Sequence, residues 1–515
     1  MPIKVAMIGA GSIGFTRALV RDILGVAELA DTTFAFTDIS RRNLQMVAQL
    51  CQRDIQANKL PARIVATTDR RAAIADSNYV FSTIRQGGLD AFKLDIDVPL
   101  KYGIDQCVGD TLCAGGIMYA QRTIPALLEF CKDIRQVAKP GAIFLNYSNP
   151  MAMNTWACCK YGGVPTVGLC HGVQGAHWQI AHVIEIWAKT RGLLPRDYVT
   201  EGHKPNMRQA QGWGLDFPIG LHRKEVPVVA AGINHQTWFV KVLWRGRDMT
   251  GLLPELLAAH PEYSRTEKVR IDVLRRFGYY STESNGHLSE YVPWYRKRPG
   301  EIRKWIDLSS WINGETGGYL RVCTEGRRWF TTEFPKWLKG EPRQIGPEHR
   351  GEEHGSYIIE ALQTGRIYRG HFNVVNRGHI PNLPDGCIVE IPAYVDKTGI
   401  NAPVVGPLPL ACAATCAASV RVQELAMEAA VHGDLTLLKQ AMLHDPLTGA
   451  VCDPEEIWQM ADEMLVAQAR WLPQYRSDIA PARKRLADHV RRGTRVRLRS
   501  TRGAARLKAK WPQQE

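Results

Sequence analysis

The sequence predicts an α/β protein whose N-terminal part is a doubly wound sheet and whose second domain is of a mixed α+β type. Short apolar segments alternate with segments of helical periodicity through about the first 190 residues. Each of these apolar segments ends in small or polar residues. Because ligands of a doubly wound sheet bind at the carboxyl ends of its parallel strands, we expect functional residues at these segment ends.

The first strand is predicted at residues 3–8, where Ile-Lys-Val-Ala-Met-Ile is typical of a buried parallel strand. It leads directly into Gly9-Ala10-Gly11-Ser12-Ile13-Gly14, and helical periodicity follows from Phe15 to Leu24. This pattern indicates a strand, a glycine turn and a helix. Four further strands of the N-terminal sheet are predicted at 33–37, 79–84, 142–145 and 166–169.

Composition divides the chain into four segments. A polar stretch rich in Gly, Pro and Arg indicates a surface insertion that forms a lid or an oligomer contact. The region beyond it is expected to bind substrate and mediate oligomerisation, with a strand at 387–391 and amphipathic helices at about 411–431 and 454–470. The predicted segments are the N-terminal domain (1–190), the insertion (191–227), the mixed domain (228–478) and a basic tail (479–515).

The net charge of +14 is unevenly distributed along the chain. Residues 480–515 hold 12 Lys and Arg against 2 acidic residues, which gives +10 and leaves +4 for the rest. A basic tail that contains Gly and Ala is more typical of a solvated extension than of a nucleic-acid or membrane arm. We therefore expect no nucleic-acid partner and assign the tail no role in the chemistry.

Neither a membrane segment nor a secretion signal is expected. No run approaches the roughly 18 uninterrupted apolar residues of a membrane helix, and the chain starts directly with a strand pattern. Twelve cysteines in 515 residues are too sparse for a disulfide scaffold, and pairs such as Cys158 and Cys159 lack the spacing of a zinc ribbon. These features predict a cytoplasmic protein whose cysteines are mostly reduced.

The glycine turn has the context of a dinucleotide-binding site. Its Gly-x-Gly-x-x-Gly pattern follows a predicted strand, opens a helix and precedes an acidic residue, Asp38, by 24 positions. Gly9 permits the tight turn and Gly11 lets a pyrophosphate approach the backbone, while the helix start around Ser12 and Gly14 offers unpaired N–H groups to phosphate. The sequence therefore predicts a Rossmann-like domain that binds a dinucleotide.

Asp38 indicates NAD rather than NADP. Its carboxylate would accept hydrogen bonds from the ribose hydroxyls and would repel a 2′-phosphate. Arg41 and Arg42 follow closely and could tolerate a phosphate, so NADP stays an alternative. Arg85, directly after the strand predicted at 79–84, is a further candidate for cofactor contact.

The residues at later strand ends differ from those of a lactate-type or malate-type dehydrogenase, which keeps a His–Asp pair and an Arg that clamps a carboxylate. Here Cys170 follows one strand and His235 another. A thiolate and a neutral imidazole are good ligands for a borderline divalent ion, and two protein ligands leave positions open for substrate oxygens. Cys170 and His235 are the candidate metal pair; a structural cysteine and an ordinary core histidine are the alternative.

The chain resembles glycoside hydrolase family 4 over about residues 3–475, through six motifs that recur there in the same order. Within the family it is most similar to the α-galactosidases, through residues 149–156 and 282–284. Two features differ from the α-galactosidases. Gly172 stands where their signature has Ser, and the insertion puts more residues between the candidate ligands Cys170 and His235 than is usual in the family. The motifs are Gly9-Ala10-Gly11-Ser12, Asp110-Thr111-Leu112 with Gly115-Gly116-Ile117-Met118, Asn146-Tyr147-Ser148-Asn149-Pro150-Met151, Cys170-His171-Gly172, Ala231-Gly232-Ile233-Asn234-His235 and Asn382-Leu383-Pro384-Asp385-Gly386.

The resemblance implies an α-glycosidase, with galactose as the first candidate sugar, that depends on NAD and on Mn²⁺ or another divalent cation. A Cys-His-Gly signature is also similar to that of α-glucosidases and α-uronidases, so these stay alternatives. The implied route is NAD-mediated oxidation at C3, removal of the C2 proton, elimination, addition of water and re-reduction, which regenerates the cofactor in each turnover. The implied partner is a small α-glycoside, and the implied assembly is a homodimer or homotetramer.

The resemblance also implies a base near Glu283 that removes the C2 proton. Tyr280, His287 and Tyr291 stay rivals for this role. On a helix, His287, Glu290 and Tyr291 would share one face, from which they could orient the base or the metal. The catalytic candidates are therefore Glu283, Cys170, His287 and Tyr291, and the residues expected to contact the sugar are Asp110, Asn149 and His171.

Two other functions stay open. A plain NAD-dependent dehydrogenase of sugars or hydroxy acids would release NADH in proportion to turnover. A non-catalytic regulator that senses a nucleotide or a sugar would bind its ligand without cleaving it. If its basic tail contacted nucleic acid, that binding would weaken with salt.

Overall fold

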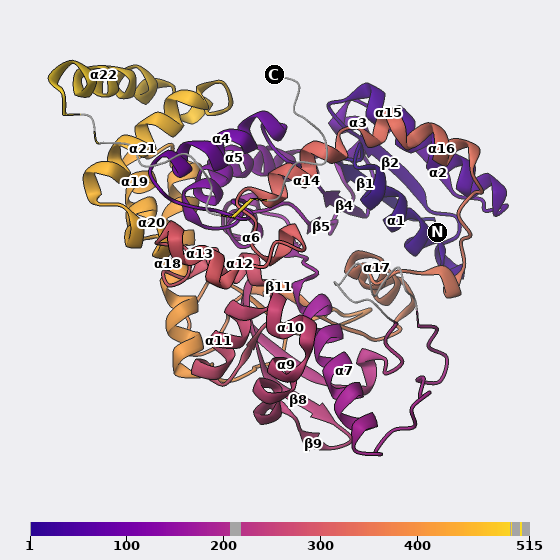
Figure 1. Ribbon diagram of the computed structural model, residues 1–515. Helices are drawn as coiled ribbons and strands as arrows, with labels where there is room; N and C mark the ends of the chain where they lie inside the picture. Colours follow the sequence, from indigo (N-terminus) through magenta and orange to yellow (C-terminus); the bar gives the residue numbers. More distant parts are fainter. Residues whose placement is uncertain (1, 206–217, 495, 497–504, 507–515) are drawn as a thin grey trace.

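In the described part of the chain, thirteen strands form one mixed sheet surrounded by helices (Figure 1). The computed structural model describes residues 2–205, 218–494, 496 and 505–506. Eleven strands follow the path β10-β8-β7-β12-β11-β6-β5-β4-β1-β2-β3, while β9 pairs with β8 and β13 pairs with β12. The sheet therefore has a parallel half from the N-terminal residues and an antiparallel half from later ones.

The parallel half has the order β3-β2-β1-β4-β5-β6, which is a doubly wound arrangement. All five strands predicted here are confirmed, and the helix predicted at 15–24 is found as α1 (Ile13–Leu24). The edge strand β3 was not predicted because its residues are largely exposed and form no buried apolar segment. The strands are β1 (Lys4–Ile8), β2 (Thr33–Thr37), β3 (Arg63–Thr67), β4 (Tyr79–Ser82), β5 (Ile143–Asn146) and β6 (Thr166–Gly168).

The other half of the sheet is antiparallel. Its strand β11 joins the parallel half where Asn373 pairs with Gly168, so the sheet continues across the domain boundary predicted near residue 190. Strand β12 meets β7 where Glu390 pairs with Gly232. The strands are β7 (Val228–Ile233), β8 (Gln236–Trp244), β9 (Arg247–Asp248), β10 (Tyr280–Ser281), β11 (Tyr368–Val375), β12 (Ile388–Asp396) and β13 (Gly399–Asn401).

Helices connect the parallel strands and build most of the chain after residue 250. The predicted helices at 411–431 and 454–470 are confirmed as α18 (Leu410–His432) and α21 (Pro454–Ala467). The other α-helices are α2 (Arg41–Ala57), α3 (Arg70–Ile74), α4 (Gly88–Lys101), α5 (Cys113–Val137), α6 (Met151–Ala157), α7 (Gly172–Thr190), α9 (Leu253–Ala259), α10 (Pro261–Thr266), α11 (Lys268–Phe277), α12 (Asn285–Tyr291), α13 (Pro299–Trp305), α14 (Gly318–Gly326), α15 (Trp329–Thr332), α16 (Phe334–Lys339), α17 (His354–Thr364), α19 (Leu435–His444), α20 (Pro446–Val451) and α22 (Arg476–Arg492).

The largest apolar core contains buried residues from Val98 on α4 to Ala482 on α22. Helix α18 packs against α5 and α6 in it. Ile117 on α5 and Met427 on α18 are fully buried there, and burial of a side chain of this size contributes roughly 1.5–3 kcal/mol. This core packs strands of the antiparallel half against α5 and α6 of the N-terminal part.

The predicted insertion at 191–227 is partly built into the core. Its residues 206–217 lie outside the described residues. Leu194, Ile219 and Leu221 are buried in an apolar cluster with α7 and β8. The flanks are therefore not the purely surface segment that composition predicted, and the role of the insertion as a lid or oligomer contact stays a prediction.

The basic tail begins as a helix. Residues 479–492 belong to α22, on which Ala482 is buried and the other residues are at least partly exposed. Ala505 is buried against α13, whereas most of the predicted tail beyond residue 496 lies outside the described residues. No described helix is long and apolar enough to cross a membrane. All twelve cysteines are free thiols.

Candidate active site

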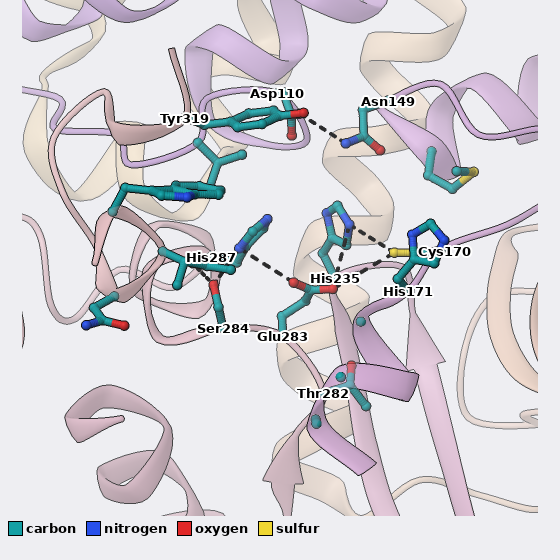
Figure 2. A pocket seen from close by; sticks show the side chains of 18 of the residues that line it. Asp110, Asn149, Cys170, His171, His235, Thr282, Glu283, Ser284, His287 and Tyr319 are labelled. Atoms are coloured by element: carbon teal, nitrogen blue, oxygen red, sulfur yellow. Dashed lines mark hydrogen bonds and ion pairs between the residues drawn. The ribbon is translucent and has the colours of Figure 1, made fainter. Parts of the chain in front are cut away.

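The carboxyl ends of the parallel strands open into a cavity of about 960 Å³. Its wall combines the turns after β1, β4, β5 and β6 with residues 309–313, Tyr319 and the segment before α12. Figure 2 shows part of this wall, including Asn149, Cys170 and Glu283. Most of the predicted site residues lie on this wall. The predicted residues that follow β4, β5 and β6 therefore lie together at the carboxyl ends of these strands, as expected for a doubly wound sheet.

The glycine turn forms a cradle that leaves no space for side chains. Gly9 has a φ of +86°, and a Cβ on it would lie 2.9 Å from the carbonyl of Thr83. A Cβ on Gly11 would lie 2.7 Å from Oδ2 of Asp38, an oxygen that accepts a hydrogen bond from the Gly11 N–H at 2.9 Å. A cradle of bare backbone at the start of a helix fits the pyrophosphate of a dinucleotide.

Three more of the predicted cofactor residues, Ser12, Gly14 and Asp38, lie at this cradle. Ser12 immediately precedes α1 and lines the cavity, and Gly14 lies in the first turn of that helix. Asp38 follows β2, and its Oδ1 accepts a hydrogen bond from the Ser40 N–H at 2.7 Å. Oδ2 of Asp38 thus holds the glycine turn and Oδ1 holds the loop after β2. The contact of Asp38 with a ribose stays a prediction.

Three side chains from separate segments converge in the cavity wall (Figure 2). The Sγ of Cys170 lies 3.3 Å from Nε2 of His235 and 4.0 Å from Oε1 of Glu283, and the latter two atoms are 3.7 Å apart. Cys170 follows β6, His235 forms the turn between β7 and β8, and Glu283 lies between β10 and α12. A thiolate, an imidazole and a carboxylate suit a borderline divalent cation. The predicted pair therefore lies together, and Glu283 becomes a third candidate ligand.

The surroundings of these groups change their acidity. Burial, together with the carboxylates of Glu283 and Glu390, raises the pKa of the Cys170 thiol well above its ordinary value. Burial alone would raise the pKa of Glu283, but His235 and His287 are close enough to bring it below its ordinary value. Glu283 is therefore ionised at neutral pH, whereas Cys170 needs a bound cation to become a thiolate.

Glu283 and His287 line the cavity, whereas the two tyrosines considered as rival bases are buried and do not line it. Oε2 of Glu283 lies 3.5 Å from Nδ1 of His287. The ring of Tyr291 stacks on the imidazole of His235, with 6.1 Å between the ring centroids. The geometry thus favours Glu283 over Tyr280 and Tyr291 as the base, and it gives Tyr291 a supporting position beside His235.

The predicted sugar-binding residues also line this cavity. Oδ2 of Asp110 accepts hydrogen bonds from Asn149 at 3.0 Å and from Arg85 at 3.3 Å. Arg85, predicted to contact the cofactor, therefore lies beside the two candidate sugar ligands. His171 is half exposed, and its Nε2 lies 2.8 Å from a carboxylate oxygen of Glu353.

The structure brings three further residues to the site. Glu390 on β12 is buried, and burial raises its pKa to about 7; a carboxylate inside the predicted apolar strand was a signal that could have found it. The hydroxyl of Thr111 lies 2.9 Å from Nδ1 of His235, and its place in a family-like motif was a second signal. Arg270 lines the cavity and donates to the carbonyl of Ser281 at 2.7 Å. It carried no signal because nothing in its helix marks one arginine among several.

Two family models match this chain. The model described as family 4 glycosyl hydrolase matches residues 4–186, and that of the family 4 glycosyl hydrolase C-terminal domain matches residues 230–448. The chain belongs to glycosyl hydrolase family 4. The resemblance drawn from the six sequence motifs is thereby confirmed, and the predicted insertion at 191–227 falls between the two matched regions.

Two curated relatives of this family 4 chain are α-galactosidases. The one from Rhizobium meliloti (strain 1021) is 55% identical over 506 residues, which cover 98% of this chain and 95% of the relative. The one from Bacillus subtilis (strain 168) is 31% identical over 92% of this chain and 100% of its own length. A 6-phospho-β-glucosidase from Thermotoga maritima, solved with manganese, NAD⁺ and glucose-6-phosphate, has the same fold. Its TM-score is 0.67 at 21% identity, over 91% of this chain and 99% of that one.

Gly172 controls the position of the Glu283 carboxylate in this family 4 enzyme. A Cβ at residue 172 would lie 1.9 Å from Oε1 of Glu283, so a side chain there must shift this carboxylate from its present position. We expect Gly172→Ala to lower kcat for glycoside cleavage about 100-fold, the effect of displacing a reacting group by about 1 Å. Steady-state kinetics would show it. Gly251→Ala, where a Cβ meets nothing within 4 Å, is the control, and an unchanged kcat in Gly172→Ala would contradict the prediction.

Proposed function

We propose that this family 4 enzyme is an α-galactosidase that works with NAD and a divalent cation such as Mn²⁺. Its 55% and 31% identical relatives are α-galactosidases, and a structural neighbour was solved with manganese and NAD⁺. The observation that carries the proposal is the convergence of Cys170, His235 and Glu283 on the cavity that the glycine turn also borders. A dinucleotide cradle and a cation-binding trio on one cavity support redox-assisted cleavage of one sugar.

When bound, NAD supplies a hydride acceptor and the cation supplies a Lewis acid beside the sugar. Cys170 and His235 would hold the cation, and Glu283 would take the proton from C2 of the sugar. The carboxylate of Glu283 is held from both sides, since Oε1 faces the two ligands and Oε2 faces His287. Asp110 and Asn149 would bind and orient the sugar hydroxyls.

The charges on the cavity wall favour a neutral sugar. Among the described lining residues, carboxylates outnumber guanidinium groups and no lysine occurs. The guanidinium of Arg85 lies 3.3 Å from Asp110, and that of Arg270 lies 3.1 Å from Glu267. A uronic acid or a phosphorylated sugar would add a negative charge without an uncommitted arginine to receive it. Galactose therefore fits better than a uronate or a sugar phosphate.

Several wider expectations accompany this proposal. The substrates would be small α-galactosides, and the enzyme would have no nucleic-acid partner. The enzyme would work in the cytoplasm as a homodimer or homotetramer.

A panel of nitrophenyl α-glycosides tests the function directly. With NAD⁺, Mn²⁺ and a reductant present, we expect rapid release of nitrophenol from the α-galactoside and much slower release from the α-glucoside and the α-galacturonide. Chelation of the metal or removal of NAD should stop the reaction, because the first loss removes the Lewis acid and the second removes the hydride acceptor. NADH should not accumulate in proportion to product.

Each alternative has its own outcome in this assay. Faster cleavage of the glucoside or the galacturonide would show that glucose or galacturonic acid, rather than galactose, is the sugar that the enzyme recognises. Stoichiometric NADH would indicate a dehydrogenase. Full activity after the nucleotide has been stripped would overturn the proposal altogether.

A further inference from the structure

A chain of hydrogen bonds leads from the candidate metal ligand His235 to the candidate sugar ligand Asp110. Nδ1 of His235 lies 2.9 Å from the Oγ1 of Thr111. The hydroxyl of Thr111 donates in turn to Oδ1 of Asp110 at 2.9 Å. Thr111 is buried, with 1% of its surface exposed, so water does not compete readily for these bonds.

The direction of these bonds follows from the atoms available. A threonine hydroxyl has one proton to donate, and a carboxylate can only accept. The other oxygen of Asp110 already accepts from the Asn149 amide and the Arg85 guanidinium, which can only donate. The Thr111 proton therefore goes to Asp110, and Nδ1 of His235 must be the donor to Thr111.

This direction decides the state of the other ring nitrogen. In a neutral imidazole only one nitrogen carries a proton, so a protonated Nδ1 leaves a lone pair on Nε2. That nitrogen faces Cys170 Sγ at 3.3 Å and Glu283 Oε1 at 3.7 Å. We propose that Thr111 is a positioning residue that fixes the tautomer of His235, so that Nε2 is ready to bind the cation. This rests on the proposed function only in taking His235 as a metal ligand.

The fold holds Thr111 firmly in place for this role. A Cβ on Gly116 of α5 would lie 2.4 Å from the backbone carbon of Thr111, so the chain packs there onto bare backbone. The carboxylate of Glu290 accepts hydrogen bonds from the backbone N–H groups of residues 107–109, at 2.5 to 3.0 Å. Glu290 on α12 thus anchors the loop before Thr111, close to the helix face that supports His235.

The variant pair Thr111→Val and Thr111→Ser tests the proposal by metal binding, without any sugar. Valine keeps the shape of threonine but cannot accept the Nδ1 proton, and loss of such a supporting group typically weakens metal binding about 10- to 100-fold. We expect a loss of this size for Mn²⁺, titrated into the NAD-loaded protein by electron paramagnetic resonance or calorimetry. Thr111→Ser keeps the hydroxyl, and its Mn²⁺ affinity should stay within about threefold of the original.

Two further readouts and a control variant separate positioning from a general structural effect. The affinity for NAD and the melting temperature should not move in a folded Thr111→Val variant. Thr123→Val on α5 is the matched control, because its equally buried hydroxyl donates only to the helix carbonyl of Tyr119. If Thr111→Val does not fold, Thr111→Ala removes the same hydroxyl without adding a methyl group, and the same loss is expected. Unchanged Mn²⁺ affinity in the folded hydroxyl-free variant would overturn the proposal, whichever sugar the enzyme cleaves.

Discussion

Replacing Cys170 with serine should abolish glycoside cleavage while leaving NAD binding intact. The thiol lies 3.3 Å from His235 and 4.0 Å from Glu283, where a bound cation would convert it to a thiolate. A serine hydroxyl does not ionise readily, so the site loses one of its anionic ligands. Because even a supporting residue costs 10- to 100-fold in metal affinity, we expect Mn²⁺ to bind more than about 100-fold more weakly. Calorimetry of Mn²⁺ and NAD binding, beside the galactoside assay, checks both parts.

Cys159→Ser is the matched control for this variant. Cys159 is another partly exposed cysteine, but it does not line the cavity, and its thiol donates to the carbonyl of Thr166 in β6. Since burial raises the pKa of Cys170, Mn²⁺ binding near neutral pH should release a proton in the original enzyme and in the control. The Cys170→Ser variant should release none. Full activity with a continued need for metal in Cys170→Ser would remove Cys170 from the site.

Replacing Glu283 with glutamine should stop the exchange of the C2 proton with solvent. The carboxylate is ionised, because the two neighbouring histidines hold its pKa below the ordinary value, and an amide of the same shape cannot take a proton. A general base contributes about 10²- to 10⁴-fold to a rate, so exchange and cleavage should both fall by that order. Incorporation of deuterium at C2 of the galactoside in D₂O, followed by mass spectrometry or NMR, measures the step directly.

The same experiment distinguishes a base from a metal ligand. If Glu283 acts mainly as the base, Glu283→Gln should bind Mn²⁺ nearly as well as the original enzyme, since the remaining amide oxygen can still contact a cation. A large loss of Mn²⁺ affinity would make Glu283 chiefly a ligand. Undiminished exchange in Glu283→Gln would move the base to another group, and exchange lost in Tyr280→Phe or Tyr291→Phe would identify it.

The parallel half of the fold followed from local patterns. Strand β1, the glycine turn, α1 and β2 all lie within the first 37 residues, and each is specified by neighbouring side chains. The two glycines of that turn are also required for local reasons. Gly9 lies against Thr83 at the end of the neighbouring strand and Gly11 lies against Asp38, so neither position has space for a Cβ. The candidate dinucleotide site could therefore be predicted in detail from one segment of sequence.

The antiparallel half was harder to predict because its pairings join distant segments. Strands β11 and β12 come from residues after 367, yet they lie between β6 and β7 in the sheet. Nothing local in the sequence specifies this order, since single pairings such as Asn373 with Gly168 connect the strands. The sequence therefore predicts a domain boundary near residue 190, although the sheet continues through that point.

By itself, the sequence determined the doubly wound fold, the glycine cradle and the membership in family 4, because short motifs carry all three. Only the tertiary structure placed Glu283 beside Cys170 and His235 and connected His235 to Asp110 through Thr111. The physical reason is that hydrogen bonds and metal ligands act over about 3–4 Å in space, whereas contacting groups here are up to 124 residues apart along the chain. Sheet pairing and the shared core bring them together, and no local pattern encodes that distance.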